Sequence, residues 1–188
     1  MNRRLRGALW AALALVVAIA AARVGQAALS ARQQATPDAP AEGGGDATLL
    51  DGYDATVLTA SGDPVLLSEI ADGRPLVINF WATWCPYCVD ELPDFQDIYA
   101  TYGDRVSFAF VDVADGRRET VDAAVSWVAE QGFDDLPVFF DTSLEASGRF
   151  GARSLPTTVI VAADGTIQTV TTGRIDPALV RGALEAMV

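Results

Sequence analysis

The chain has 188 residues, of which 51% are hydrophobic and 20% charged, and its formal net charge is -12. This composition is typical of a globular protein, and the acidic balance argues against nucleic-acid binding, which needs a basic surface. All 13 basic residues are arginine, so the sequence contains neither lysine nor histidine. Catalysis by a histidine base, lysine Schiff-base chemistry and histidine-ligated metal sites are therefore excluded. The chemistry must use two cysteines, carboxylates, tyrosines or backbone groups.

Residues 1–29 have the pattern of a membrane signal. Arg3, Arg4 and Arg6 precede an uncharged apolar run over residues 7–22, and such a basic start places the N-terminus in the cytoplasm. Two outcomes stay open: the segment is retained as an anchor, or it is cleaved after small residues at 25–27. We expect a single-pass signal-anchor in the cell membrane with the catalytic domain on the extracytoplasmic (periplasmic) side, or a secreted or periplasmic protein after cleavage.

Residues 30–47 are rich in alanine, proline, glycine and glutamine and contain no large apolar side chain. Such a stretch buries too little surface to offset the entropy cost of ordering it. We interpret it as a flexible linker to a domain over residues 48–188.

Strand and helix patterns alternate along that domain. Apolar runs predict strands at 76–81, 106–113 and 137–140, and Asp164-Gly165 predicts a hairpin of strands 157–161 and 167–171. Helical spacing, caps and breakers predict helices at 86–102, 118–131, 143–150 and 177–186. Two βαβ crossovers followed by a hairpin and a helix predict an α/β fold with a mixed central sheet and helices on both faces.

The two cysteines form a Cys85-Pro86-Tyr87-Cys88 motif between a buried strand and a helix. Pro86 suits the first helical position, which makes Cys85 the N-cap. Free N–H groups and the helix dipole then favour a thiolate there, so we expect the pKa of Cys85 to be depressed and Cys85 to be the nucleophile. Cys88, one turn further, is placed to resolve a mixed disulfide.

Two alternatives to redox chemistry exist for this pair. A purely structural disulfide closing so short a loop would contribute about 2 kcal/mol, against about 4.7 kcal/mol for a 100-residue loop. A metal site would need two further ligands, and the sequence offers no histidine and no third cysteine. Redox chemistry is favoured, with no metal and no cofactor.

Residues 79–88, NFWATWCPYC, resemble the active-site segment of thioredoxin-fold proteins. Over residues 48–188 the chain resembles the TlpA/ResA-type family of membrane-tethered extracytoplasmic thiol–disulfide oxidoreductases. The resemblance rests on Trp84, on Glu91 three residues after Cys88, on residues 155–158 (LPTT), on the helix at 118–131 and on the N-terminal signal with its linker.

The resemblance implies roles for several residues around the cysteines. Pro156 would be cis and would face the disulfide, leaving the backbone of Leu155 free to pair with a substrate strand. The expected substrate-binding residues are Trp84, Pro86, Tyr87, Leu155 and Pro156.

Glu91 is the expected third catalytic residue beside Cys85 and Cys88, exchanging a proton with Cys88. In thioredoxin the strand carries a buried aspartate at the position of Asn79. TlpA-type proteins resemble this chain in having asparagine there. The alternative for Glu91 is a carboxylate that merely complements the helix N-terminus.

The predicted function is extracytoplasmic protein thiol–disulfide exchange. Family resemblance favours reduction of protein disulfides, for example of apocytochrome c in cytochrome c biogenesis, with electrons from a membrane thiol donor. A DsbA-like thiol oxidant is the main alternative. A peroxiredoxin-like peroxidase is less favoured, because Ala82 stands three residues before Cys85, where a Thr-x-x-Cys motif would have threonine.

Overall fold

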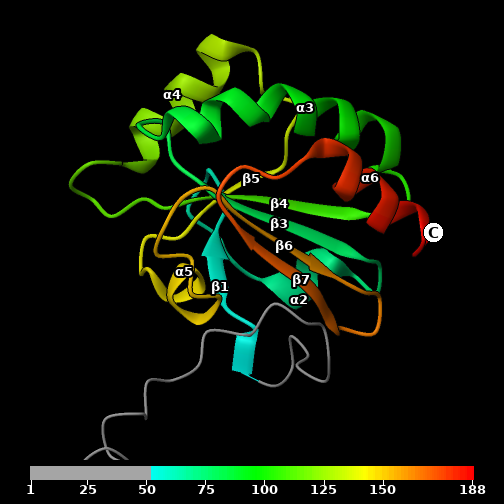
Figure 1. The fold of residues 1–188 in the computed structure, drawn as a ribbon. Coiled ribbons are helices and arrows are strands. Elements are labelled where there is room, and N and C mark those ends of the chain that lie inside the picture. The colour runs from blue at the N-terminus through cyan, green and yellow to red at the C-terminus, as the bar shows by residue number, and fades with distance from the viewer. Residues whose placement is uncertain (1–51) are drawn as a thin grey trace, which may run out of the picture. The chain divides into compact units, whose positions relative to one another are not determined.

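A seven-stranded mixed sheet, in the order β2-β1-β5-β4-β3-β6-β7, forms the centre of the part of the chain that the computed structural model describes, residues 52–188 (Figure 1). The strands are β1 (Thr56–Leu58), β2 (Pro64–Leu66), β3 (Leu76–Trp81), β4 (Ser107–Asp112), β5 (Val138–Phe140), β6 (Thr157–Val161) and β7 (Ile167–Thr172). The helices are α2 (Leu67–Ala71), α3 (Pro86–Tyr102), α4 (Val121–Gln131), α5 (Glu145–Arg149) and α6 (Pro177–Glu185).

The predicted membrane segment 1–29 and linker 30–47 lie outside the described residues. No helix among residues 52–188 has the length and apolar character needed to cross a bilayer.

Strands β3, β4 and β5 are parallel and are connected through α3 and α4. β6 runs antiparallel to β3 and pairs with β7 as the hairpin predicted around Asp164-Gly165. Every residue of β3 and of β4 is buried, as expected for central strands covered on both faces. The predicted mixed sheet is therefore confirmed. Its parallel strands end at one edge, where the cysteine motif begins.

The alternation of side chains along β3 divides the core between the two faces of the sheet. Val77 and Trp81 pack in one apolar cluster with residues of α3, α4 and α6. Ile78 and Phe80 pack in a second cluster that includes Leu67 of α2 and Ala146 of α5. Figure 1 shows the same division, with α3, α4 and α6 above the sheet and α2 and α5 below it.

The structure corrects the start of one predicted helix. α4 begins at Val121 rather than at residue 118, because Thr120 caps it by accepting a hydrogen bond of 3.3 Å from the N–H of Ala123. Residues 113–120 form a separate turn instead. The other predicted elements lie within two residues of their observed bounds, whereas β1, β2 and α2 precede the first strand that the sequence pattern predicted.

Candidate active site

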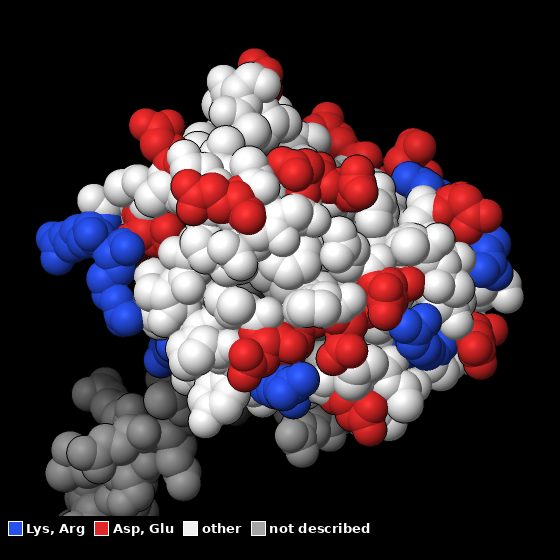
Figure 2. Space-filling view, turned by 90° about the horizontal axis from the view of Figure 1, so that it is seen from above, with Lys and Arg blue, Asp and Glu red and all other residues white. Residues whose placement is uncertain are grey.

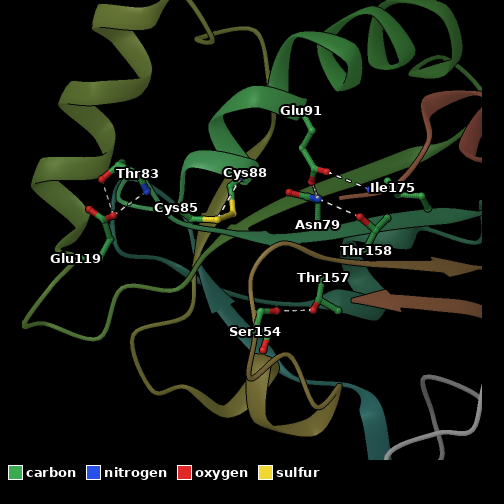
Figure 3. Close-up of a disulfide and its surroundings, with 10 residues drawn as sticks. All are labelled: Asn79, Thr83, Cys85, Cys88, Glu91, Glu119, Ser154, Thr157, Thr158 and Ile175. Carbon is green, nitrogen blue, oxygen red and sulfur yellow. Dashed lines mark hydrogen bonds between the residues drawn. A yellow bond between two sulfur atoms is a disulfide. The ribbon is translucent and has the colours of Figure 1, made fainter. Parts of the chain in front are cut away.

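The cysteine motif lies at the start of α3, directly after the loop that leaves β3. Cys85 is the N-cap, Pro86 occupies the first turn, and the N–H of Cys88 donates a hydrogen bond of 3.3 Å to Sγ of Cys85. The two cysteines form a disulfide, drawn in Figure 3. Cys85 is 3% exposed and Cys88 is fully buried, so the outer sulfur is the one accessible to a partner. The predicted N-cap geometry is confirmed.

Exposed side chains surround the buried pair. Trp84 is 39% exposed and Tyr87 is 63% exposed, and Pro86 is also exposed. Large aromatic side chains are enriched where proteins bind one another. These three of the predicted substrate-binding residues therefore lie on the surface beside Cys85.

The other two predicted substrate-binding residues reach the same edge from β6. The Leu155–Pro156 peptide bond is cis, as the resemblance implied. Thr157 pairs with Phe80, so in this antiparallel ladder Pro156 lies beside Trp81, where β3 ends. Neither the N–H nor the C=O of Leu155 forms a backbone hydrogen bond with a described residue, which leaves both groups available to an added strand.

Glu91 lies on α3, three residues after Cys88, and is only 1% exposed. Its Oε1 accepts a hydrogen bond of 2.8 Å from Asn79 Nδ2, and its Oε2 accepts one of 3.4 Å from the N–H of Ile175 (Figure 3). Burial raises the pKa of Glu91 to about 7, while these two hydrogen bonds and the charge of Arg174 oppose that rise. A buried carboxyl that titrates near neutrality, on the helix that carries the cysteine pair, is a candidate for proton transfer.

Sequence reasoning missed a second buried carboxyl at the same edge of the sheet. Asp112 ends β4 directly beside Trp81 of β3 and is fully buried. Neither of its carboxyl oxygens has a hydrogen-bond partner among the described residues. Burial, reinforced by the negative charges of Glu119 and Asp115, raises the pKa of Asp112 to about 8. Asp112 is therefore predominantly protonated at pH 7.

Sequence reasoning also missed the contact between Glu119 and the active-site loop. Glu119 is 2% exposed, and its Oε2 accepts hydrogen bonds from the N–H of Thr83 at 2.8 Å and from the Thr83 hydroxyl at 2.6 Å. Figure 3 shows this pair beside Cys85. The two residues are 36 positions apart in sequence, so no local pattern signals the contact.

Together, the sheet, the flanking helices and the cysteine pair define a thioredoxin-like thiol–disulfide oxidoreductase site. The model of the AhpC/TSA family matches residues 51–170. The chain belongs to that family.

Curated relatives are similar in sequence over much of the domain. The thiol-disulfide oxidoreductase ResA of Halalkalibacterium halodurans is 27% identical over 124 residues, covering 66% of this chain and 68% of the relative. ResA of Oceanobacillus iheyensis is 31% identical over 111 residues, covering 59% of this chain and 55% of the relative.

Solved structures agree with these relatives. The exposed lipoprotein thioredoxin Etrx1 of Streptococcus pneumoniae has a TM-score of 0.62 and 25% identity, covering 71% of this chain and 98% of that chain. A secreted Mycobacterium tuberculosis disulfide oxidoreductase homologous to E. coli DsbE has a TM-score of 0.61 and 26% identity, covering 72% and 98%. The predicted resemblance to ResA-type proteins, the thioredoxin-like fold and the class of thiol–disulfide oxidoreductase are confirmed.

Proposed function

We propose that the protein reduces disulfides in protein clients outside the cytoplasmic membrane. The observation that carries this proposal is the Cys85–Cys88 disulfide at the N-terminus of α3, with Cys85 accepting the Cys88 N–H and a buried carboxyl at Glu91 one turn further. The helix N-terminus and the Cys88 N–H stabilise a Cys85 thiolate once the pair is reduced. The Glu91 carboxyl is a group that can accept a proton near pH 7.

In the first step the Cys85 thiolate of the reduced protein attacks one sulfur of the client disulfide. A mixed disulfide forms, the client disulfide breaks, and the second client sulfur leaves as a thiolate that takes a proton from solvent. The Cys88 N–H and the positive end of the α3 dipole lower the energy of the attacking thiolate before it reacts.

In the second step Cys88 resolves the mixed disulfide. Ionised Glu91 accepts the Cys88 proton, the resulting thiolate attacks Sγ of Cys85, and the remaining client sulfur leaves as a thiolate. Two electrons have then passed to the client, and the Cys85–Cys88 disulfide is regenerated. Asn79 and the Ile175 N–H hold the Glu91 carboxyl in place throughout.

The cycle needs a dithiol donor that reduces the Cys85–Cys88 disulfide. We assign this role to a membrane thiol carrier, in keeping with the signal-anchor predicted at residues 1–29. Exported proteins with paired cysteines, among them apocytochrome c, are the proposed clients. The same steps run in reverse describe a DsbA-like oxidant, so the steady-state redox form of the pair decides between the two directions.

Acid-quenched alkylation of the protein in its host tests the direction of transfer. A reductase is found mostly as the dithiol, and a predominantly oxidised pair would overturn that assignment. The Cys88→Ser variant should accumulate mixed disulfides on Cys85, and their analysis identifies the clients. The Cys85→Ser variant is the matched control and should trap none of these adducts by the same route.

A further inference from the structure

Residues 113–120, which connect β4 to α4, are folded around one carboxylate. Oδ1 of Asp115 accepts hydrogen bonds from the N–H groups of Arg117, Arg118 and Glu119 at 2.8, 2.7 and 3.2 Å. Gly116, with φ of 71°, closes the turn by donating its N–H to the Glu119 carbonyl at 2.9 Å. The turn is therefore held by the Asp115 side chain together with a backbone hydrogen bond.

This turn is attached directly to the active-site loop. Glu119 accepts hydrogen bonds from both the N–H and the hydroxyl of Thr83, which lies two residues before Cys85. The two hydrogen bonds, at 2.8 and 2.6 Å, converge on one oxygen of a buried carboxyl. The attachment fixes where the neighbouring side chain of the turn, Arg118, lies relative to the cysteines.

Arg118 stacks on the exposed tryptophan of the site. Its guanidinium carbon lies 3.6 Å from the centroid of the Trp84 ring, and Trp84 immediately precedes Cys85. Arg118 forms no ion pair with any carboxylate in residues 52–188. A guanidinium stacked on a ring keeps the N–H groups of its edge free, and that edge matches a carboxylate in two-point hydrogen bonding.

The domain around this arginine is predominantly acidic. Residues 52–188 contain eight arginines and 21 aspartate and glutamate residues. Figure 2 shows acidic side chains spread over the face viewed, with arginine side chains protruding at the left, the side on which the β4–α4 turn lies in Figure 1, and others at the right and the lower edge. A fixed cation beside the nucleophile of an acidic domain favours a local negative charge on the partner.

We propose that Arg118 is a specificity-determining residue that binds an aspartate or glutamate close to the target cysteine of the client. The proposal rests on the proposed function and narrows its substrate class to disulfides with an acidic side chain near the attacked sulfur in the sequence of the client.

The test uses two peptides, each with one intramolecular disulfide, that differ only by glutamate or glutamine beside the attacked cysteine. Reduced full-length protein is mixed with each peptide, and the second-order rate of the first exchange is measured. We expect the glutamate peptide to react about 1.4- to fivefold faster, the range that corresponds to 0.2–1 kcal/mol for exposed ion pairs. The preference should shrink at high salt.

Variants separate recognition from structure. Arg118→Ala should bring the two peptides to equal rates, and Arg118→Glu should favour a lysine peptide over the glutamate peptide. Arg105 is the matched control, because it also lies over an aromatic ring, 5.4 Å from the centroid of Tyr102, but near the opposite end of α3. Arg105→Ala should keep the wild-type preference.

Three results would count against the proposal. Equal rates for both peptides with the wild-type protein would overturn the role of Arg118 while leaving the redox function intact. An Arg118→Ala variant that slows both peptides by the same factor would make Arg118 a structural residue only. A wild-type protein that reduces neither peptide would overturn the proposed function and the specificity together.

Discussion

Asn79 donates a hydrogen bond of 2.8 Å from Nδ2 to Oε1 of Glu91, joining the central strand β3 to the active-site helix α3. The same amide group also donates to the hydroxyl of Thr158 at 3.1 Å, so β6 shares in the arrangement. Because Asn79 is neutral, Glu91 is the single ionisable member of this buried group. The pKa of Glu91 therefore depends directly on whether the amide is present.

The Asn79→Ala substitution should raise the pKa of Glu91 above about 7. The hydrogen bond from Asn79 favours the ionised carboxylate and so lowers the pKa of Glu91. Without it, the rise in pKa caused by burial is opposed less strongly. The midpoint of the pH dependence of mixed-disulfide resolution reports this pKa. A midpoint that stays at its wild-type value would show that the amide does not act on Glu91.

The Glu91→Gln substitution should slow resolution by about 100-fold, the lower end of the range for general acid–base catalysis. The rate should also lose its rise with pH through about 7, where Glu91 ionises in the wild type. Rapid-quench measurement of the mixed disulfide follows this step. Asp97→Asn is the matched control, since Asp97 is also on α3 but is not among the charges that shift the pKa of Glu91.

The rate at which the mixed disulfide forms is an internal check on the Glu91→Gln variant, because Glu91 is proposed to act only in the resolution step. In a Cys88→Ser background, Glu91→Gln should leave the attack by Cys85 close to its wild-type rate. Slowing of both steps by the same factor would mean that Glu91 supports the fold of the site rather than the proton transfer.

Asp112 should make the oxidised protein less stable as pH rises. Its folded pKa of about 8 lies above the ordinary value of 3.8, so the folded state binds the extra proton between these values. The stability that this protonation provides is full below about pH 4 and is lost as pH rises through about 8. Asp112→Asn should accordingly stabilise the protein at pH 9 by a few kcal/mol relative to wild type.

Chemical unfolding of the oxidised protein at pH 5 and at pH 9 measures this effect. Asp164→Asn is a control, because Asp164 is exposed in the β6–β7 hairpin and its pKa is lowered by the Thr166 N–H. Parallel loss of stability in wild type and Asp112→Asn between the two pH values would contradict the assignment.

Glu119→Ala should destabilise the domain by about 1–3 kcal/mol, since it leaves the Thr83 N–H and hydroxyl without their acceptor. Glu119→Gln retains an acceptor oxygen and should recover most of that loss. Denaturant unfolding gives the free energies. Equal destabilisation by alanine and glutamine would show that the charge matters and the hydrogen bonds do not.

The part of the site that sequence predicts well is the part built from neighbours in the chain. Pro86 after Cys85 indicates a helix start, and the spacing from Cys88 to Glu91 places both on one helix face. These local rules are satisfied in the structure because α3 is a long helix with a buried side.

The contacts that sequence missed depend on the fold as a whole. Glu119 meets Thr83 only after β4 has paired with β3, and Asp112 is buried because the sheet is covered on both faces. β1 and β2 are three residues each, too short for an alternating pattern to be distinctive. Asp115 is a polar loop residue by composition, yet it folds the turn that carries Arg118.

The difference in exposure between the two cysteine residues gives the exchange reaction a fixed regiochemistry. Cys85 is slightly exposed and Cys88 is not, so each incoming reagent meets the same atom first. Brief treatment of the native dithiol with iodoacetamide should therefore label one site per molecule, with the second appearing only in denaturant. This asymmetry means that the protein forms a mixed disulfide with one partner at a time, through Cys85. Cys88, which releases that partner, stays inaccessible to other thiol reagents.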